Sequence, residues 1–251
     1  MTLFGYRVPM FASLIVWCLI WEIVGRYELV FLFPPFSGVL HAMTEIVPTG
    51  KFQSATVTTL YCFAVGMALA IAVGIPLGVL MGRVKAADQL LGMWVNVFVS
   101  APLSALVPVL MLLFGFGEKT VIMSVFLFAV WIIALDTQAG IRHMAPSLIE
   151  MGQSYGASRV QLYGKIILIA ALPEILAGIR VGFIRGVKGV VIGQLLVSII
   201  GYGELFEIYS RNFLMEEFWA VTIILFAFAL LLSEAVGLIE KRIQFYAGAR
   251  A

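Results

Sequence analysis

The sequence predicts an all-α membrane protein with about six transmembrane helices in a single domain, residues 1–251. Of its residues 62% are hydrophobic and only 12% are charged, where an average globular domain has about 25% charged residues. Its mean hydropathy is +1.06. Its apolar residues also form runs long enough to cross a bilayer as helices. A soluble core of this length could not bury so much apolar surface, whereas a bilayer accommodates it.

Six segments reach the roughly 20 mostly apolar residues that a helical span needs. They are approximately 9–25, 57–81, 90–115, 120–136, 176–200 and 218–239. The first has no small-residue cleavage site, so we expect an uncleaved helix rather than a signal peptide. Pro34 and Pro35 then predict an extended turn, because each proline disfavours helix in the residue before it. Residues 37–47 predict a short helix on the membrane surface.

The basic residues predict that both termini lie in the cytoplasm, because Lys and Arg accumulate on that side of a membrane. Nine then fall in cytoplasmic segments: Arg7, Arg83, Lys85, Arg142, Arg159, Lys165, Lys241, Arg242 and Arg250. Four fall in external segments: Arg26, Lys51, Lys119 and Arg211. The longest internal loop, about residues 137–175, is cytoplasmic in this orientation.

Small residues recur every four positions in two of the predicted spans. The second span carries Ala70, Gly74, Gly78 and Gly82, and the fifth carries Gly178, Gly182 and Gly186, followed by Gly189 and Gly193. This spacing lets helix backbones approach closely. In the second span it indicates packing within the chain. In the fifth, the same glycines could instead leave room for a pathway or permit bending.

The polar segment at about 145–172 predicts two short helices set at an angle. Pro146 suits the first position of a helix, and Glu150 is expected early in that helix, where a negative charge favours the dipole. Gly156 permits a sharp change of direction. A second helix from about Ala157 would end near Pro173, which cannot continue it.

This segment resembles the cytoplasmic loop of the permease subunits of bacterial ABC importers, which has the form E-A-A-x3-G-x9-I-x-L-P. Glu150, Gly156, Ile166 and Leu168 are in register with that pattern, whereas Met151 and Gly152 replace the alanines and Ile169 replaces the proline. Further similarity lies in Phe33-Pro34-Pro35, Gly74-Ile75-Pro76-Leu77-Gly78, Phe114-Gly115-Phe116-Gly117, Ala177-Gly178-Ile179-Arg180 and Gly201-Tyr202-Gly203. The ending Ala170-Ala171-Leu172-Pro173 is similar to the branch that imports nitrate, sulfonates, taurine and pyrimidine precursors.

The resemblance implies a fold like that of type I ABC importers, in a bacterial inner membrane. It also implies a homodimer of this chain, two cytoplasmic ATPase subunits and an external solute-binding protein. The loop would contact the ATPase as a coupling helix through Glu150, Met151, Gly152, Tyr155, Gly156, Ala157 and Ser158. A purely structural loop that caps the membrane domain is the alternative. No cofactor is expected on this chain, which has no G-x-x-x-x-G-K-[ST] loop for ATP.

Ionisable groups inside membrane spans are costly and usually face a protein interior or a cavity. Arg185 and Lys188 are three residues apart in the fifth span, and Gln194 follows. We expect these three residues to be candidates for lining a pathway for a small anionic solute. The alternative for the two cations is a structural ion pair with Asp136 or Glu234.

Other classes of protein fit less well. The chain has no G-x-S-x-G sequence and no paired His ligands, so neither an enzyme nor a metal site is predicted. The net charge of +2 does not suggest a nucleic acid partner. A secondary transporter that works without an ATPase is the alternative function.

Overall fold

The computed structural model describes residues 2–3, 6–7, 10–197 and 199–248, and within them the chain is almost entirely helical. Four long helices follow the longest axis of the molecule: α3 (Gly50–Arg83), α6 (Glu118–His143), α10 (Leu172–Val197) and α12 (Met215–Gly248). The N-terminus adds a two-residue antiparallel pairing of β1 (Thr2–Leu3) with β2 (Tyr6–Arg7). Arg250, which enters the basic count, lies outside the described residues.

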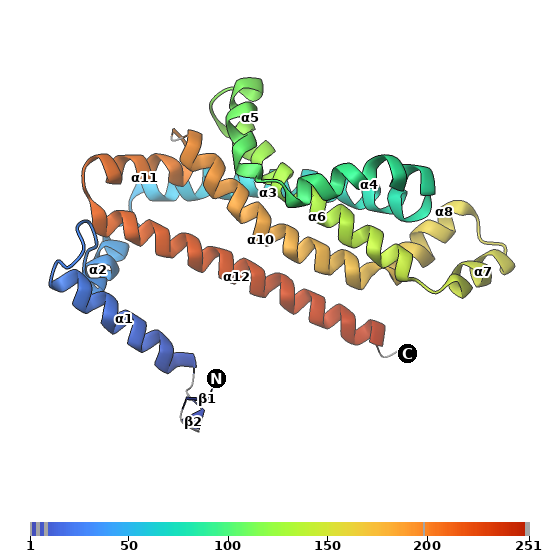
Figure 1. Cartoon of the computed structure of the whole chain (residues 1–251), viewed down its shortest axis with the longest axis horizontal. Coiled ribbons are helices and arrows are strands. Elements are labelled where there is room, and N and C mark those ends of the chain that lie inside the picture. The colour runs from blue at the N-terminus through green and yellow to red at the C-terminus, as the bar shows by residue number, and fades with distance from the viewer. Residues whose placement is uncertain (1, 4–5, 8–9, 198, 249–251) are drawn as a thin grey trace.

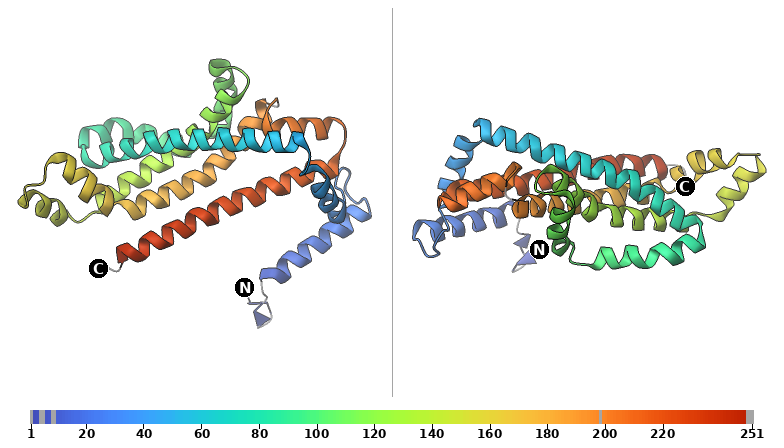
Figure 2. Two further views of the ribbon diagram at one scale, coloured as in Figure 1. Left: turned by 180° about the vertical axis from the view of Figure 1, so that it is seen from behind. Right: turned by 90° about the horizontal axis from the view of Figure 1, so that it is seen from above.

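Shorter helices cover the two ends of this bundle (Figures 1 and 2). At one end lie α2 (Phe36–Ile46) and α11 (Gly201–Arg211), and α1 (Met10–Arg26) leads away from that end. At the other end lie α7 (Pro146–Ser154) and α8 (Arg159–Gln161), followed by the π-helical segment η2 (Leu162–Ile167) and α9 (Leu168–Ala170). The short helix predicted at residues 37–47 therefore exists as α2, and its place on the membrane surface stays a prediction.

Within the described residues, α3 and α6 are long and apolar enough to cross a membrane. Two bent pairs of helices could each supply one more span, which raises the number to as many as four. The prediction of an apolar, helical membrane protein is thus confirmed, while six as the number of spans stays a prediction. The predicted spans 9–25 and 218–239 coincide with α1 and α12.

The predicted span at residues 90–115 is a bent pair of helices rather than one straight helix. The chain forms α4 (Lys85–Ser100), the short 3₁₀ helix η1 (Leu103–Leu106) and α5 (Val107–Phe114), with a bend of 99° between the two parts. The break falls at Ala101 and Pro102, because proline has no N–H for a helix and drives the residue before it into an extended conformation. Figure 1 shows α5 standing out sideways from the bundle.

The stripes of small residues pack helices together, as the spacing in α3 indicates. A Cβ atom on Gly74 would lie 3.0 Å from the Val130 carbonyl oxygen, and one on Gly78 would lie 2.5 Å from the Ala134 carbonyl oxygen. The stripe in α10 does the same, since a Cβ on Gly189 would lie 2.9 Å from the Ser124 carbonyl oxygen. The glycines of α10 therefore admit α6 and, at Gly186, the Met67 side chain of α3, so in this structure they serve packing rather than a pathway.

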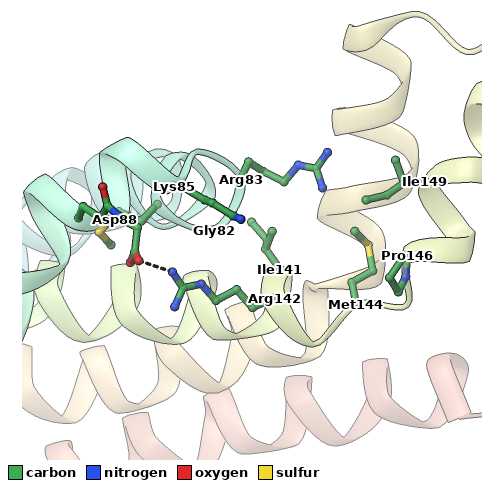
Figure 3. Close-up of a pocket in the computed structure, with 11 residues that line it drawn as sticks. Gly82, Arg83, Lys85, Asp88, Ile141, Arg142, Met144, Pro146 and Ile149 are labelled. Carbon is green, nitrogen blue, oxygen red and sulfur yellow. Dashed lines mark ion pairs between the residues drawn. The ribbon is translucent and has the colours of Figure 1, made fainter.

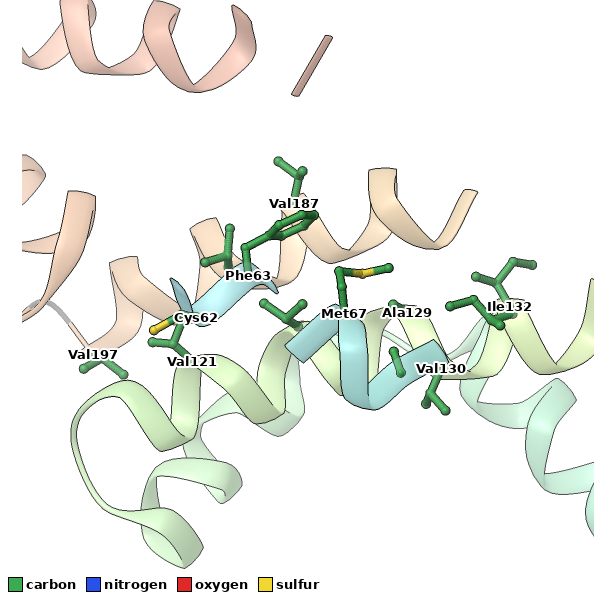
Figure 4. Packing of buried hydrophobic residues seen from close by; sticks show 13 residues of the cluster. Cys62, Phe63, Met67, Val121, Ala129, Val130, Ile132, Val187 and Val197 are labelled. Atoms are coloured by element: carbon green, nitrogen blue, oxygen red, sulfur yellow. The ribbon is translucent and has the colours of Figure 1, made fainter. Parts of the chain in front are cut away.

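The main core lies where α3, α6 and α10 meet. Its buried residues include Cys62, Phe63, Met67, Val121, Ala129 and Val187, which interlock between the three helices (Figure 4). Close packing replaces the hydrophobic effect as the main attraction between helices in a bilayer. This three-helix core is the rigid frame from which both the α7–α9 segment and the broken helix pair α4–α5 extend.

Candidate functional site

The segment between α6 and α10 forms the predicted pair of angled helices. Pro146 occupies the first position of α7, where its missing N–H costs nothing. Glu150 is exposed and is the fifth residue of α7, just past the first turn, where the helix dipole favours a negative charge less strongly. The π-helical segment η2 and the 65° bend near Ala171 then turn the chain into α10.

Gly156 makes the turn between the two short helices. Its φ angle is +71°, in the left-handed region that only glycine enters without a steric cost. The next helix begins with a capping box. The Ser158 backbone N–H donates to the Gln161 Oε1 atom at 2.9 Å, and the Gln161 backbone N–H donates to the Ser158 hydroxyl oxygen at 3.3 Å. The turn is therefore defined by both conformation and hydrogen bonds.

One side of this segment packs inward and the other faces outward. A Cβ on Gly152 would lie 2.5 Å from the Ile166 Cδ1 atom, so α7 and η2 contact each other directly at this glycine. Leu162 and Ile167 are buried with Ile141 from α6. On the outward side, Tyr155 is 87% exposed and Val160 is 83% exposed. Tyr155 therefore makes little packing contact in the described structure and leaves its ring on the surface.

Arg185 lies on α10 beside the break in the α4–α5 pair. Its Nη1 atom donates a hydrogen bond to the Val99 carbonyl oxygen at 3.3 Å, and Val99 belongs to the last turn of α4. Carbonyls in a last turn lack helical partners and carry a partial negative charge. The charge of Arg185 also acts on Asp136 in α6, one of the two carboxylates predicted as its partner, although no carboxylate of the described residues lies within 4 Å of it.

Lys188 contacts different elements from Arg185. Its side chain is exposed and lines a cavity of about 510 Å³ between α10, α11 and α12. The cavity is otherwise apolar and includes Phe206, Trp219 and Phe226. No ion pair of Lys188 occurs within the described part of the chain, and Glu234, the other predicted partner, is itself exposed. The two cations thus do not form a single basic wall in one subunit.

Gln194 is buried in the contact between helices rather than exposed to a cavity. It is 2% exposed, and its Nε2 atom donates to the Thr59 hydroxyl at 3.0 Å. That hydroxyl donates to the Ala55 carbonyl oxygen at 2.8 Å and accepts the Tyr202 backbone N–H at 3.4 Å. This network ties α10 to α3 and α11, so the geometry favours a structural role for Gln194.

Sequence reasoning missed a polar cluster beside the α7 segment. The Asp88 carboxylate at the start of α4 accepts hydrogen bonds from both Arg142 and Gln138 of α6, and its Oδ2 atom lies 2.6 Å from the Arg142 Nη2 atom. Figure 3 shows this pair in a cavity of about 600 Å³ that is also lined by Arg83 and Met144. In the sequence, Asp88 follows two basic residues in one predicted cytoplasmic segment, and Arg142 lies in another. That these two residues pair could be known only from the folded structure.

Comparisons with known proteins agree with this architecture. Residues 74–245 match the family described as the binding-protein-dependent transport system inner membrane component. The chain is 29% identical over 226 residues to the taurine transport system permease protein TauC of Escherichia coli K12, covering 87% of this chain and 80% of that protein. It is 28% identical to the putative aliphatic sulfonates transport permease protein SsuC of Bacillus subtilis 168, covering 89% of this chain and 82% of that protein.

The carnitine transport permease protein OpuCD of Listeria monocytogenes is 35% identical over 59% of this chain and 65% of its own length. Among solved structures, an inward-facing conformation of the MetNI methionine ABC transporter shares the fold, with a TM-score of 0.65 at 22% identity over 77% of this chain and 96% of that chain. The matched residues include the end of α3 from Gly74 onward, all of α6 and α10, and the α7–α9 segment. The chain therefore belongs to the binding-protein-dependent transport family, as a permease subunit of an ABC importer rather than an enzyme or a secondary transporter.

Proposed function

We propose that two copies of this chain form the translocation pathway of an ATP-driven importer for a small anionic solute. Two cytoplasmic ATPase subunits would hydrolyse ATP, and an external binding protein would deliver the solute. The single observation that carries the coupling role is the outward surface of the α7–α8 turn, with Tyr155 87% exposed beside the left-handed Gly156. The proposed contact comprises Glu150, Met151, Tyr155, Gly156, Ala157 and Ser158. Gly152, also expected there from the sequence, is buried against Ile166 and would support the contact from within.

Reconstitution tests this function directly. The chain, co-expressed with the ATPase and binding protein of its own transport system, should purify as a complex with two copies of itself and two ATPase subunits. In proteoliposomes the complex should take up solute only when ATP and the loaded binding protein are both present. Uptake that continues without the ATPase would contradict the proposal.

The orientation in the membrane is also part of the proposal. The α7–α9 segment lies at the same end of the bundle as the end of α3 and the start of α4 (Figure 1), which is consistent with the cytoplasmic side inferred from the basic residues. Both termini would then be cytoplasmic. Reporter fusions at Gly203 should report the external side and fusions at Ser158 the cytoplasmic side, and the reverse pattern would overturn this orientation.

For the solute, Lys188 supports the anionic class. It is a cation without a carboxylate partner in the described structure and lines a largely apolar cavity. A cation in such surroundings is costly unless water or an anion compensates it. Arg185 also stays a pathway candidate, although one of its N–H groups is already used by the hydrogen bond to the Val99 carbonyl oxygen. The names of TauC and SsuC, taurine and aliphatic sulfonate permeases, favour the same class.

Replacing Lys188 with methionine should lower solute uptake by at least about fivefold, a loss in the range of typical coupling and binding effects. The Lys188→Arg variant keeps the charge and should retain most of the uptake. The amount of assembled complex, measured by gel filtration, should be the same for both variants. Wild-type uptake by Lys188→Met would remove this residue from the pathway.

A further inference from the structure

The cluster of Asp88, Gln138 and Arg142 joins two parts of the chain that the proposed function must link. Asp88 lies in the first turn of α4, and Arg142 lies in the last turn of α6, 54 positions later. One carboxylate accepts from both α6 side chains, with 2.6 Å between Asp88 Oδ2 and Arg142 Nη2. Its place at a helix N-terminus adds a favourable interaction with the helix dipole.

On one side, the cluster adjoins α7, which belongs to the segment proposed to contact the ATPase. Arg142 and His143 end α6, and after Met144 and Ala145 the chain begins α7 at Pro146. Met144, Pro146 and Ile149 line the same cavity as the cluster (Figure 3). A displacement of α7 therefore acts directly on the turn of α6 that Asp88 holds, in addition to the route through η2 and α9 into α10.

On the other side, the cluster leads to the break in the α4–α5 pair. The far end of α4 stacks the Phe98 ring on Trp131 of α6, with 4.4 Å between ring centroids and 8° between ring planes. Arg185 of α10 donates to the Val99 carbonyl oxygen there. Since α4 is one unbroken helix from Lys85 to Ser100, a shift at its start moves its far end, which contacts α6 and α10.

The charges of the cavity make the pairing selective. Arg83 and Lys85 line the cavity, and neither has an ion-pair partner in the described part of the chain. Of the charged residues that line the cavity, Asp88 is acidic, whereas Arg83, Lys85 and Arg142 are basic. Gln138 adds a second donor that only the α6 side offers. Without the Asp88 charge, the cations would repel one another across the joint between α4 and α6.

We propose that Asp88, Gln138 and Arg142 are positioning residues that transmit movement of the α7 coupling segment to α4 and thereby to the broken helix pair. They would touch neither the solute nor the ATPase. This inference rests on the proposed function, in which α7 contacts the ATPase. In this proposal, the break between α4 and α5 is the element that moves when the ATPase displaces α7.

The test measures the ratio of solute-stimulated to basal ATP hydrolysis in the reconstituted complex, normalised to the amount of assembled complex. Asp88→Asn and Arg142→Gln should each lower this ratio by about fivefold or more, the lower end of typical coupling energies. The double variant Asp88→Arg with Arg142→Asp should recover at least half of the wild-type ratio, as expected of residues that act through each other. Gln138→Met keeps both charges and should lower the ratio about twofold, below the effect of losing either charge.

Arg83→Gln is the matched control, because it removes a cation from the same cavity without breaking an ion pair. It should keep the wild-type ratio. Wild-type ratios in both single variants, an equal loss in Arg83→Gln, or no recovery in the charge-swapped double variant would each overturn the inference. A wild-type complex without any solute stimulation would overturn the proposed function and this inference together, whereas normal wild-type stimulation with unaffected variants would overturn only the inference.

Discussion

Replacing Gly156 with valine is expected to abolish solute-stimulated ATP hydrolysis while the chain still inserts into the membrane. The φ angle of +71° is strained for any side chain and most strained for a β-branched one. Holding valine there would cost about 1–3 kcal/mol, and the loop would avoid this cost by changing the turn. Because the turn sets the angle between α7 and α8, the exposed surface around Tyr155 would no longer match its partner. The measurement is ATP hydrolysis with and without loaded binding protein.

Two control variants distinguish the effect of the turn conformation from the effect of replacing any glycine in this segment. Gly164 lies in the same segment. Its φ angle is not positive, and a Cβ there would have no atom within 4 Å. Gly164→Val should therefore retain stimulated hydrolysis. Gly156→Asn should retain more than Gly156→Val, since asparagine tolerates the left-handed region better. Normal stimulated turnover in Gly156→Val would show that this turn is not the coupling element.

Replacing Gly78 with valine is expected to have the largest effect on stability. A Cβ at this position would lie 2.5 Å from the Ala134 carbonyl oxygen and 2.6 Å from the Thr137 Cβ atom. Backbone cannot rotate aside as a side chain can, so α3 and α6 would have to separate. Overpacking of this kind costs about 2 kcal/mol or more. At about 2–4 °C per kcal/mol for a chain of this size, the midpoint of thermal unfolding in detergent should fall by at least about 4 °C.

Gly50 provides the control for this second change, because it lies in the same helix and a Cβ there would meet nothing within 4 Å. Gly50→Ala should leave the midpoint unchanged or raise it slightly, since alanine loses less conformational freedom on folding. A Gly78→Val chain that unfolds at the wild-type temperature would contradict the tight α3–α6 contact. Together the two variants test whether the small-residue stripe acts through helix packing.

Local chemistry made several features predictable from the sequence. The apolar runs determined that the protein is helical and membrane-embedded, because a bilayer requires every backbone group to be paired internally. The four-residue spacing of Gly74, Gly78 and Gly82 predicted a close helix contact, and the structure supplies α6 as the partner. Gly156 was expected at a sharp turn, and its φ angle is +71°. Each of these inferences depends on residues within a few positions of one another.

Features that depend on distant residues were decided only by the tertiary structure. Nothing near Gln194 in the sequence shows that the hydroxyl of Thr59, 135 positions away, accepts a hydrogen bond from its side-chain amide. The two cations of α10 are three residues apart, yet Arg185 contacts α4 while Lys188 lines a cavity beside α11 and α12. Asp88 pairs with Arg142 rather than with Lys85, which is closer in the chain. Spacing along a helix specifies which face a side chain occupies, but only the packing of helices determines what that face meets.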